Sequence, residues 1–239
     1  MGNIHLRDLL KIAEDIKNEK IRRIVIDILT NPILSFSSVK PLISIEESPA
    51  APRKHHMFTG GLIIHTYSVI KIALMLCSIF EEVYSISIDR DLVIASALLH
   101  DIYKYYQYTK DVKEGGYKAR EDWYLSHDYA IVAELASRGA DDELIRVVSE
   151  VHGIVPIKTY EGFIVHLADS IDARFGEYHQ NNILMMLKYF ENSSCKPYAV
   201  LDEMIKRFGV KIMARLYRDR DILSEIMVNI CTQSSSNTM

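Results

Sequence analysis

Apolar residues recur at helical spacing along most of the chain, and this periodicity predicts a series of helices. In the first thirty residues Ile4, Leu9 and Ile16 follow this spacing, and the predicted helix stops at Asn31-Pro32. Further helices are predicted over roughly residues 62–83, 90–106, 126–138, 141–152, 161–176, 180–192 and 197–230. The pattern therefore predicts an all-α fold.

Polar stretches separate the predicted helices. Residues 33–43 are expected to be helical or irregular, and residues 44–61 are expected to form a loop that ends in Gly60-Gly61. Residues 107–122 are polar around Gly115-Gly116, which predicts a loop or a short hairpin. None of these segments is a convincing linker between separate domains.

The composition is that of an ordinary globular protein. Among the 239 residues, 49% are hydrophobic and 25% are charged, which excludes a disordered chain. Only 10 glycines and 6 prolines are present, which argues against a turn-rich β-sandwich or barrel. We expect one domain over residues 1–231, with its core motifs over 55–176, and a disordered tail over 232–239.

Charge and cysteine usage narrow the cellular setting. The net charge of −4 does not suggest a protein that coats nucleic acid or binds an anionic membrane surface. Cys77, Cys195 and Cys231 are far apart and lack zinc-ribbon spacing, which favours a reducing cytosol. The apolar stretch 62–80 contains His65 and is expected to be a buried helix rather than a membrane span. We therefore expect a cytoplasmic protein without a membrane partner.

Histidines and aspartates lie inside or at the ends of apolar segments. His65 lies within such a segment, His100-Asp101 and His152 each end one, and His166 and Asp169 share a fourth. Burying a polar group without a partner costs a few kcal/mol, so these groups should meet each other or a shared ion. Imidazole and carboxylate ligands suit several divalent metals. The pattern alone leaves two readings open, a shared metal site and ordinary core histidines.

Three sequence phrases carry a family resemblance. They are Gly60 to Thr66 around the first histidine, Ala97 to Lys104 around the His-Asp pair, and His166 to Ala173 around the last aspartate. Together they resemble the signature of the HD superfamily of metal-dependent phosphohydrolases. The stretch Pro49 to His56 also resembles the HD-domain 3′–5′ exoribonucleases and their stand-alone relatives. The resemblance implies an HD-domain helical bundle with additional N-terminal helices and a C-terminal helical extension.

The resemblance also implies a ligand set and a reaction. His65, His100, Asp101 and Asp169 would bind a first divalent ion. Asp101 would bridge to a second ion completed by His127 and His152, whose surroundings resemble those of two-metal members. The metal would be Mn, Fe, Ni, Co, Zn or Mg. Metal-activated water would then attack a phosphoester in a nucleotide, a cyclic nucleotide or a short single-stranded nucleic acid.

Other residues near these motifs are candidates for substrate contact. Lys104 is expected either to act on the phosphate as a catalytic residue or to be solvated, and Asp172 to orient a ligand histidine or to reach the substrate. Arg53 and His56 could hold a phosphate, whereas Lys54 and His55 are expected at the surface. Tyr103 replaces a residue that is usually glycine in the family and would narrow the site. Residues assigned to surface or packing are His5 and His179.

Two alternatives to this enzyme remain open. One is a CRISPR-associated HD nuclease, which has a similar order of ligands. The other is a non-catalytic HD module that senses a metal or a nucleotide. Residues 1–45 are predicted to be helical where the exoribonucleases have an OB-fold module, so a small phosphorylated substrate or a short strand is favoured over long nucleic acid.

Overall fold

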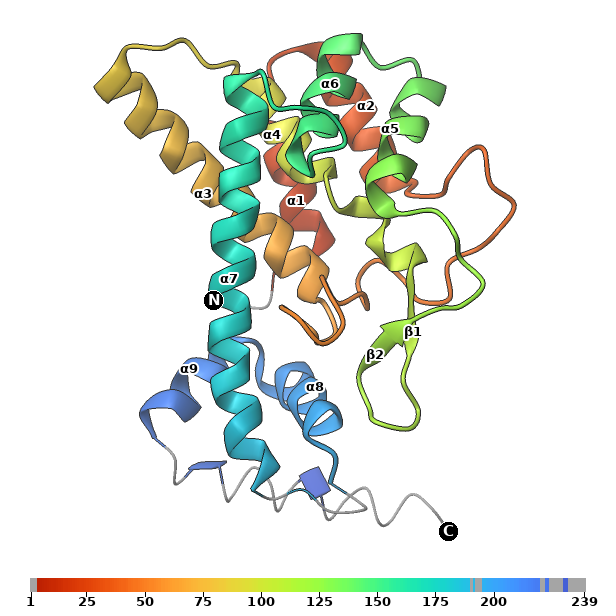
Figure 1. The fold of residues 1–239 in the computed structure, drawn as a ribbon, viewed down its shortest axis with the longest axis vertical. Coiled ribbons are helices and arrows are strands. Elements are labelled where there is room, and N and C mark those ends of the chain that lie inside the picture. The colour runs from red at the N-terminus through yellow and green to blue at the C-terminus, as the bar shows by residue number, and fades with distance from the viewer. Residues whose placement is uncertain (1–3, 190, 192–194, 220–221, 224–229, 232–239) are drawn as a thin grey trace.

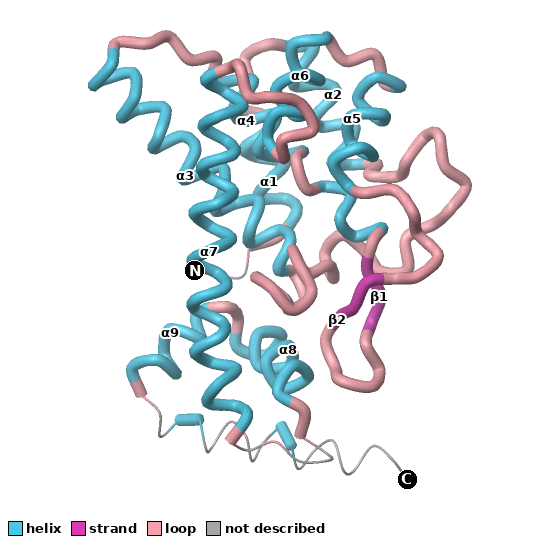
Figure 2. The backbone as a smooth tube through the Cα atoms, in the orientation of Figure 1, coloured by secondary structure: helices cyan, strands magenta, loops and turns pink. Residues whose placement is uncertain are grey.

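Helices make up most of the structure, a computed structural model that describes residues 4–189, 191, 195–219, 222–223 and 230–231. Figures 1 and 2 show their arrangement. The helices are α1 Leu6–Ala13, α2 Glu19–Thr30, α3 Gly61–Tyr84, α4 Arg90–Leu99, α5 His127–Ser137, α6 Asp142–Val151, α7 Tyr160–Lys188, α8 Pro197–Phe208 and α9 Lys211–Arg218, with a 3₁₀ turn Ile102–Tyr106 after α4. The predicted all-α class is confirmed.

The polar stretch 107–122 forms the hairpin that was one of its two predicted forms. Strands β1 Tyr108–Lys110 and β2 Tyr117–Ala119 pair antiparallel. The turn between them includes Gly115 and Gly116, both with positive φ. A Cβ on Gly115 would lie 2.5 Å from the Ala199 side chain, so the absence of a side chain lets the hairpin pack against α8.

The predicted N-terminal helix is two helices. Residues 14–18 interrupt it, and Asn18 begins α2 by accepting hydrogen bonds from the backbone amides of Lys20 and Ile21. The Asp91 carboxylate accepts hydrogen bonds from the amides of Lys17 and Asn18 and so fixes the break against α4. A contact 74 residues away in sequence therefore decides this local geometry. Residues 33–43 are irregular.

Two predictions for the C-terminal half are wrong. Residues 161–192 were expected to form two helices, whereas α7 runs unbroken through Gly176 for 29 residues. The expected helix over 197–230 ends at Gly209, whose φ of 73° does not continue a helix, and α9 begins after it. The remainder of that expected helix and the tail 232–239 lie largely outside the described residues.

Two hydrophobic cores share the long helix α7. The larger core joins its N-terminal half to helices α1 to α6. The smaller core joins its C-terminal half to α8 and α9 around Leu187, Met204 and Leu216. In Figure 1, α7 runs vertically with the first group beside its upper half and the second beside its lower half. That residues 1–231 form one domain stays a prediction.

Helix α3 is the described helix that is long and apolar enough to cross a membrane, on length and composition alone. In the structure it packs against α4 and α7 in the larger core. His65 lies in its second turn and is fully buried. This placement agrees with the prediction of a buried core helix.

The cysteines show a feature that their spacing did not predict. Cys195 and Cys231 form a disulfide with their Cα atoms 5.4 Å apart, which ties the start of the segment leading into α8 to the C-terminal segment. Cys77 is a free thiol buried in the larger core. Burial raises the pKa of this thiol to about 11, so it carries no charge at neutral pH.

Candidate metal centre

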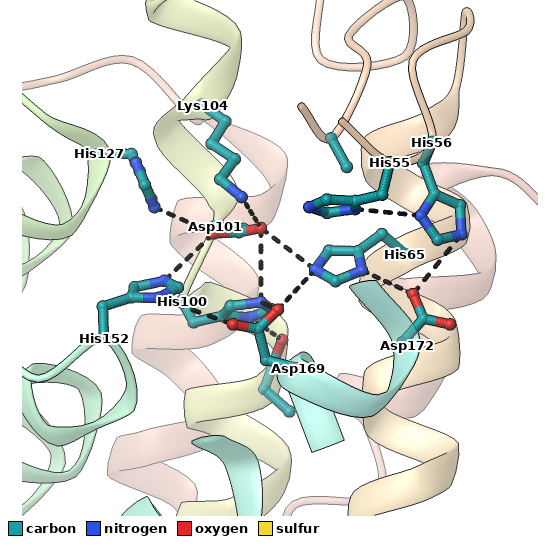
Figure 3. A network of polar contacts seen from close by, with 12 residues as sticks. His55, His56, His65, His100, Asp101, Lys104, His127, His152, Asp169 and Asp172 are labelled. Atoms are coloured by element: carbon teal, nitrogen blue, oxygen red, sulfur yellow. Dashed lines mark hydrogen bonds and ion pairs between the residues drawn. The ribbon is translucent and has the colours of Figure 1, made fainter. Parts of the chain in front are cut away.

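The six predicted ligands come from five helices and meet at one point. His65 projects from α3 and Asp169 from α7, while His100 and His152 stand at the C-terminal ends of α4 and α6. Asp101 follows α4 directly, and His127 is the first residue of α5. Figure 3 shows their side chains turned toward one another.

Four of these residues form a first cluster. His65 Nε2 lies 3.3 Å from Asp101 Oδ2 and 3.1 Å from Asp169 Oδ1. His100 Nε2 lies 3.5 Å and 3.9 Å from the same two oxygens. One atom from each of the four residues falls within 4.8 Å of the others, a spacing at which they could hold a metal ion.

A second cluster is built on the other oxygen of Asp101. Asp101 Oδ1 lies 3.1 Å from His127 Nε2 and 3.2 Å from His152 Nε2. These three residues also satisfy the spacing of a metal site. The two oxygens of one carboxylate are thus divided between two groups of histidines, as expected for a ligand that bridges two ions.

Hydrogen bonds behind the first cluster set the tautomers of its histidines. His65 Nδ1 lies 2.7 Å from Asp172 Oδ2, and His100 Nδ1 lies 2.8 Å from the carbonyl oxygen of Ala97. Both partners are acceptors, so each Nδ1 carries the proton. The Nε2 atom of each neutral ring therefore presents a lone pair to the cluster, as a metal ligand does.

The cluster gathers most of the buried side-chain atoms that lack a hydrogen-bond partner in the described part of the chain. At the cluster these atoms include Nε2 of His65, His100, His127 and His152, Nδ1 of His127, and Oδ1 of Asp101. Lone pairs that face carboxylates in a buried space are unfavourable unless positive charge lies between them. A divalent cation supplies that charge, and mixed imidazole and carboxylate donors suit Mn, Fe, Co, Ni and Zn. The residues present therefore fit a metal ion.

The electrostatics of the cluster favour positive charge. Burial alone would lower the pKa of His65, but the carboxylates of Asp101 and Asp169 beside Nε2 and of Asp172 beside Nδ1 raise it well above the ordinary value. Burial would raise the pKa values of Asp101 and Asp169, yet neighbouring cations and histidines hold both below the usual range. Protons and metal ions therefore compete for the same negatively charged site.

Lys104 lies at the cluster and is not solvated. Its Nζ is 2.6 Å from Asp101 Oδ2, and the residue is buried. Burial disfavours the ammonium, but the Asp101 carboxylate raises the pKa of Lys104, so the side chain stays charged. Of the two readings left open by the sequence, the structure supports a cation placed at the site.

The loop before α3 brings a pair of histidines to the same place. His56 lies beside Asp172, with 3.5 Å between His56 Nε2 and Asp172 Oδ2. His55 was expected at the surface, but only 9% of it is exposed, and its ring centroid lies 4.9 Å from that of His65. The basic run around it suggested a solvated loop. A hydrogen bond from Gln180 of α7 to the carbonyl oxygen of Lys54, 126 residues away in the sequence, holds this loop against α7.

Two predicted substrate contacts lie elsewhere. Tyr103 is fully buried, and its ring meets that of Tyr106 edge to face, with Glu134 of α5 among its neighbours. The structure therefore places it in the core and not in the candidate site. Arg53 is engaged at the hairpin, where its Nη2 lies 2.6 Å from Asp111 Oδ2 and its guanidinium covers the ring of Tyr198.

The remaining histidines have local roles. His166 Nδ1 lies 2.8 Å from the carbonyl oxygen of Val151, which joins α7 to the end of α6 beside His152. His5 is the N-cap residue of α1, and the ring of His179 stacks on that of Phe175. The last two agree with their assignment to surface or packing.

Comparison with known proteins gives matches over the same region. A sequence profile described as HD domain matches residues 62–174. The chain is 41% identical over 173 residues to the dihydroneopterin 2′,3′-cyclic phosphate phosphodiesterase of Methanocaldococcus jannaschii, across 71% of this chain and 69% of that relative. No solved structure matches the chain.

A second group of relatives is more distant. The chain is 28% identical over 192 residues to the 3′-5′ exoribonuclease YhaM of Bacillus subtilis. The alignment covers 72% of this chain and 59% of the exoribonuclease. The chain therefore matches about three fifths of the length of these relatives.

Proposed function

Since the chain belongs to the HD domain family of metal-dependent phosphohydrolases, we propose that it is a phosphodiesterase that opens a small cyclic phosphate ester. The observation that carries the proposal is the division of the Asp101 carboxylate between two groups of histidines. His65, His100 and Asp169 would hold one divalent ion, His127 and His152 would hold the other, and Asp101 would contact both. Bound at these residues, two such ions would lower the pKa of water and offset the charge of the phosphate.

The side chains around the ligands prepare the site for this chemistry. Asp172 and the carbonyl oxygen of Ala97 hold the rings of His65 and His100 with Nε2 directed inward. Lys104 keeps a buried positive charge beside Asp101, where it can bind a phosphate oxygen and stabilise charge that develops during the reaction.

The proposed substrate class follows from the relative with the higher identity. That relative is named for a 2′,3′-cyclic phosphate, and it shares 41% identity over most of both chains. The net charge of −4 also favours a small ester over a long polyanion. Of the two predicted phosphate contacts on the loop, Arg53 is engaged by Asp111, and His56 is engaged by Asp172. We therefore assign phosphate binding to the metal centre and Lys104.

Short RNA is the second candidate. It is supported by the Pro49 to His56 stretch and by the match to 3′-5′ exoribonucleases. The two candidates differ in what they require: a cyclic ester needs only the centre, whereas a strand also needs a path for several nucleotides. The predicted CRISPR-type nuclease and sensing module are outcomes of the same assay.

The test is an activity and metal panel on the purified chain. The wild type is loaded with Mn²⁺, Fe²⁺, Co²⁺, Ni²⁺, Zn²⁺ or Mg²⁺ and offered 2′,3′-cyclic AMP, 3′,5′-cyclic AMP, bis(p-nitrophenyl) phosphate, a short RNA and a short single-stranded DNA. We expect hydrolysis of the 2′,3′-cyclic ester to exceed that of RNA. Preference for RNA would support the second candidate, preference for DNA the CRISPR-type nuclease, and metal binding without any hydrolysis the sensing module.

Two variants and a control test the site itself. Asp101→Asn should lower hydrolysis by more than about 100-fold and should reduce the metal content. Loss of a residue that only hydrogen-bonds to a metal ligand already lowers activity by up to about 100-fold, and a direct ligand should matter more. His127→Ala, which changes only the second cluster, should lose metal from that cluster alone. Asp15→Asn removes an exposed carboxylate far from the centre and serves as the control. Full metal content and activity in Asp101→Asn would refute the assignment.

A further inference from the structure

The proposed mechanism makes no use of His55, which lies in a segment of unusual backbone geometry. Arg53 and His56 have φ values of 68° and 43°, in the left-handed region that side chains other than glycine rarely adopt. Such conformations cost of order 1–3 kcal/mol each and persist only where the surroundings enforce them. A loop that only connected two helices would not need them.

Hydrogen bonds on both sides enforce this geometry. The amides of Ala50 and Ala51 donate to the carbonyl oxygens of His56 and His55. From α7, the fully buried Gln180 accepts from the amide of Met57 and donates to the carbonyl oxygen of Lys54. The segment that carries the two histidines is thus fixed at both ends.

His56 occupies space that is free only because two neighbouring residues are glycines. A Cβ on Gly176 of α7 would lie 2.4 Å from Cε1 of the His56 ring. A Cβ on Gly61, the first residue of α3, would lie 2.0 Å from the His56 carbonyl oxygen. Neither glycine is needed for a helix, and both cost helix stability. Their presence is explained by the place of the histidine.

The contacts of the pair determine which nitrogen carries each proton. Asp172 Oδ2 faces His56 Nε2 at 3.5 Å, and an ionised carboxylate only accepts, so this nitrogen carries the hydrogen. His56 Nδ1 is then an acceptor, and it lies 3.2 Å from His55 Nδ1, which must donate. In a neutral ring the remaining nitrogen, His55 Nε2, is left with a free lone pair.

That nitrogen points toward the metal centre. In Figure 3, His55 lies above His65, and its far nitrogen is directed toward Lys104 and Asp101. The wall of the site beside Lys104 therefore presents a fixed hydrogen-bond acceptor.

We propose that His55 Nε2 accepts a hydrogen bond from a free hydroxyl group of the substrate, which in a nucleoside 2′,3′-cyclic phosphate is the 5′-hydroxyl, and so selects esters that carry such a donor over esters that lack one. This proposal deepens the proposed function and rests on it for the position of the phosphate. His55, His56 and His65 also satisfy the spacing of a metal site, with one ligand atom of each within 4.8 Å of the others. Their Nδ1 atoms are already engaged with one another or with Asp172, so a metal there would displace those hydrogen bonds.

Three substitutions at His55 test the proposal in the metal-loaded protein. His55→Leu removes the acceptor and should lower kcat/KM for 2′,3′-cyclic AMP by about 10- to 100-fold, the range for an unmet hydrogen bond in a buried site. Hydrolysis of bis(p-nitrophenyl) phosphate, which has no hydrogen-bond donor, should change by less than about threefold, within the spread of single-contact effects. His55→Gln places an acceptor near the position of Nε2 and should restore much of the loss, whereas His55→Asn should not.

The outcomes separate this proposal from the proposed function. If the wild type hydrolyses both esters and His55→Leu slows both equally, the acceptor role is wrong. If His55→Leu loses metal, the residue is a ligand and the proposal is also wrong. Should the wild type hydrolyse neither, the proposed function fails, and binding of adenosine 2′-monophosphate and phenyl phosphate is compared by calorimetry. An unchanged ratio of the two Kd values in His55→Leu would then refute the acceptor role by itself.

Discussion

Replacement of Gly176 by alanine should have two opposing effects on the free energy of unfolding. The new Cβ would lie 2.4 Å from Cε1 and 2.6 Å from Nδ1 of His56. Ordinary contact needs about 3.5 Å or more, so the ring must retreat by roughly 1 Å. Extra volume of this kind in a packed site costs about 1–3 kcal/mol. Against this, alanine is favoured over glycine inside a helix by about 1 kcal/mol.

The net change in the wild-type background should therefore lie between about zero and 2 kcal/mol of destabilisation. In a His56→Ala background the obstructing ring is absent, and the same substitution should stabilise the protein by up to about 1 kcal/mol. The two backgrounds thus differ by about 1–3 kcal/mol, which is the interaction energy between the two positions.

Urea denaturation followed by circular dichroism measures all four proteins, each freed of metal so that binding does not add to the stability. Equal m-values across the set would show that the denatured states are comparable. The reasoning is refuted if Gly176→Ala stabilises both backgrounds by the same amount, because the ring would then be free to move aside.

Two further predictions concern charge. In the metal-free protein the raised pKa of His65 contributes stability that is complete below the unfolded value of about 6.5 and is lost as the pH rises through the folded value. The melting temperature of EDTA-treated protein should therefore fall from pH 6 to pH 9 relative to Mn²⁺-loaded protein, and parallel curves would contradict this. At a distance from the site, the fully buried Glu134 accepts hydrogen bonds from Ser35 and Arg138. Glu134→Gln should cost about 2–3 kcal/mol in urea denaturation, with the exposed Glu82→Gln within about 0.5 kcal/mol of wild type.

The parts of the fold predicted from sequence are those decided by local pattern. The apolar periodicity located α3 and α4, and histidines at the ends of apolar segments indicated that side chains would converge on a buried site. The structure brings His65, His100, Asp101, His127, His152 and Asp169 together. Their service as metal ligands stays a prediction for the experiments above.

The parts that were missed depend on contacts between distant residues. Gly176 suggests the end of a helix when only its neighbours in sequence are considered, but it allows the His56 ring to approach α7. The basic run that contains His55 suggests a solvated loop. Hydrogen bonds from Gln180 and from the amides of Ala50 and Ala51 instead hold this loop against the rest of the protein. Tyr103 lies two residues after the predicted ligand Asp101, yet the 3₁₀ turn after Asp101 directs its side chain into the core beside Tyr106.

Because α7 is unbroken, the directions in which its side chains point are fixed relative to one another along its whole length. Asp169, Asp172, Gly176, Gln180 and Ile183 follow one another at intervals of three or four residues, so they share one stripe of the helix. One added residue between any two of them would turn everything beyond it by about 100° and advance it by about 1.5 Å. Asp169 in the candidate metal centre and Ile183 in the second core would then no longer both face their partners. The spacing along this stripe is therefore as much a requirement of the site as the identity of its residues.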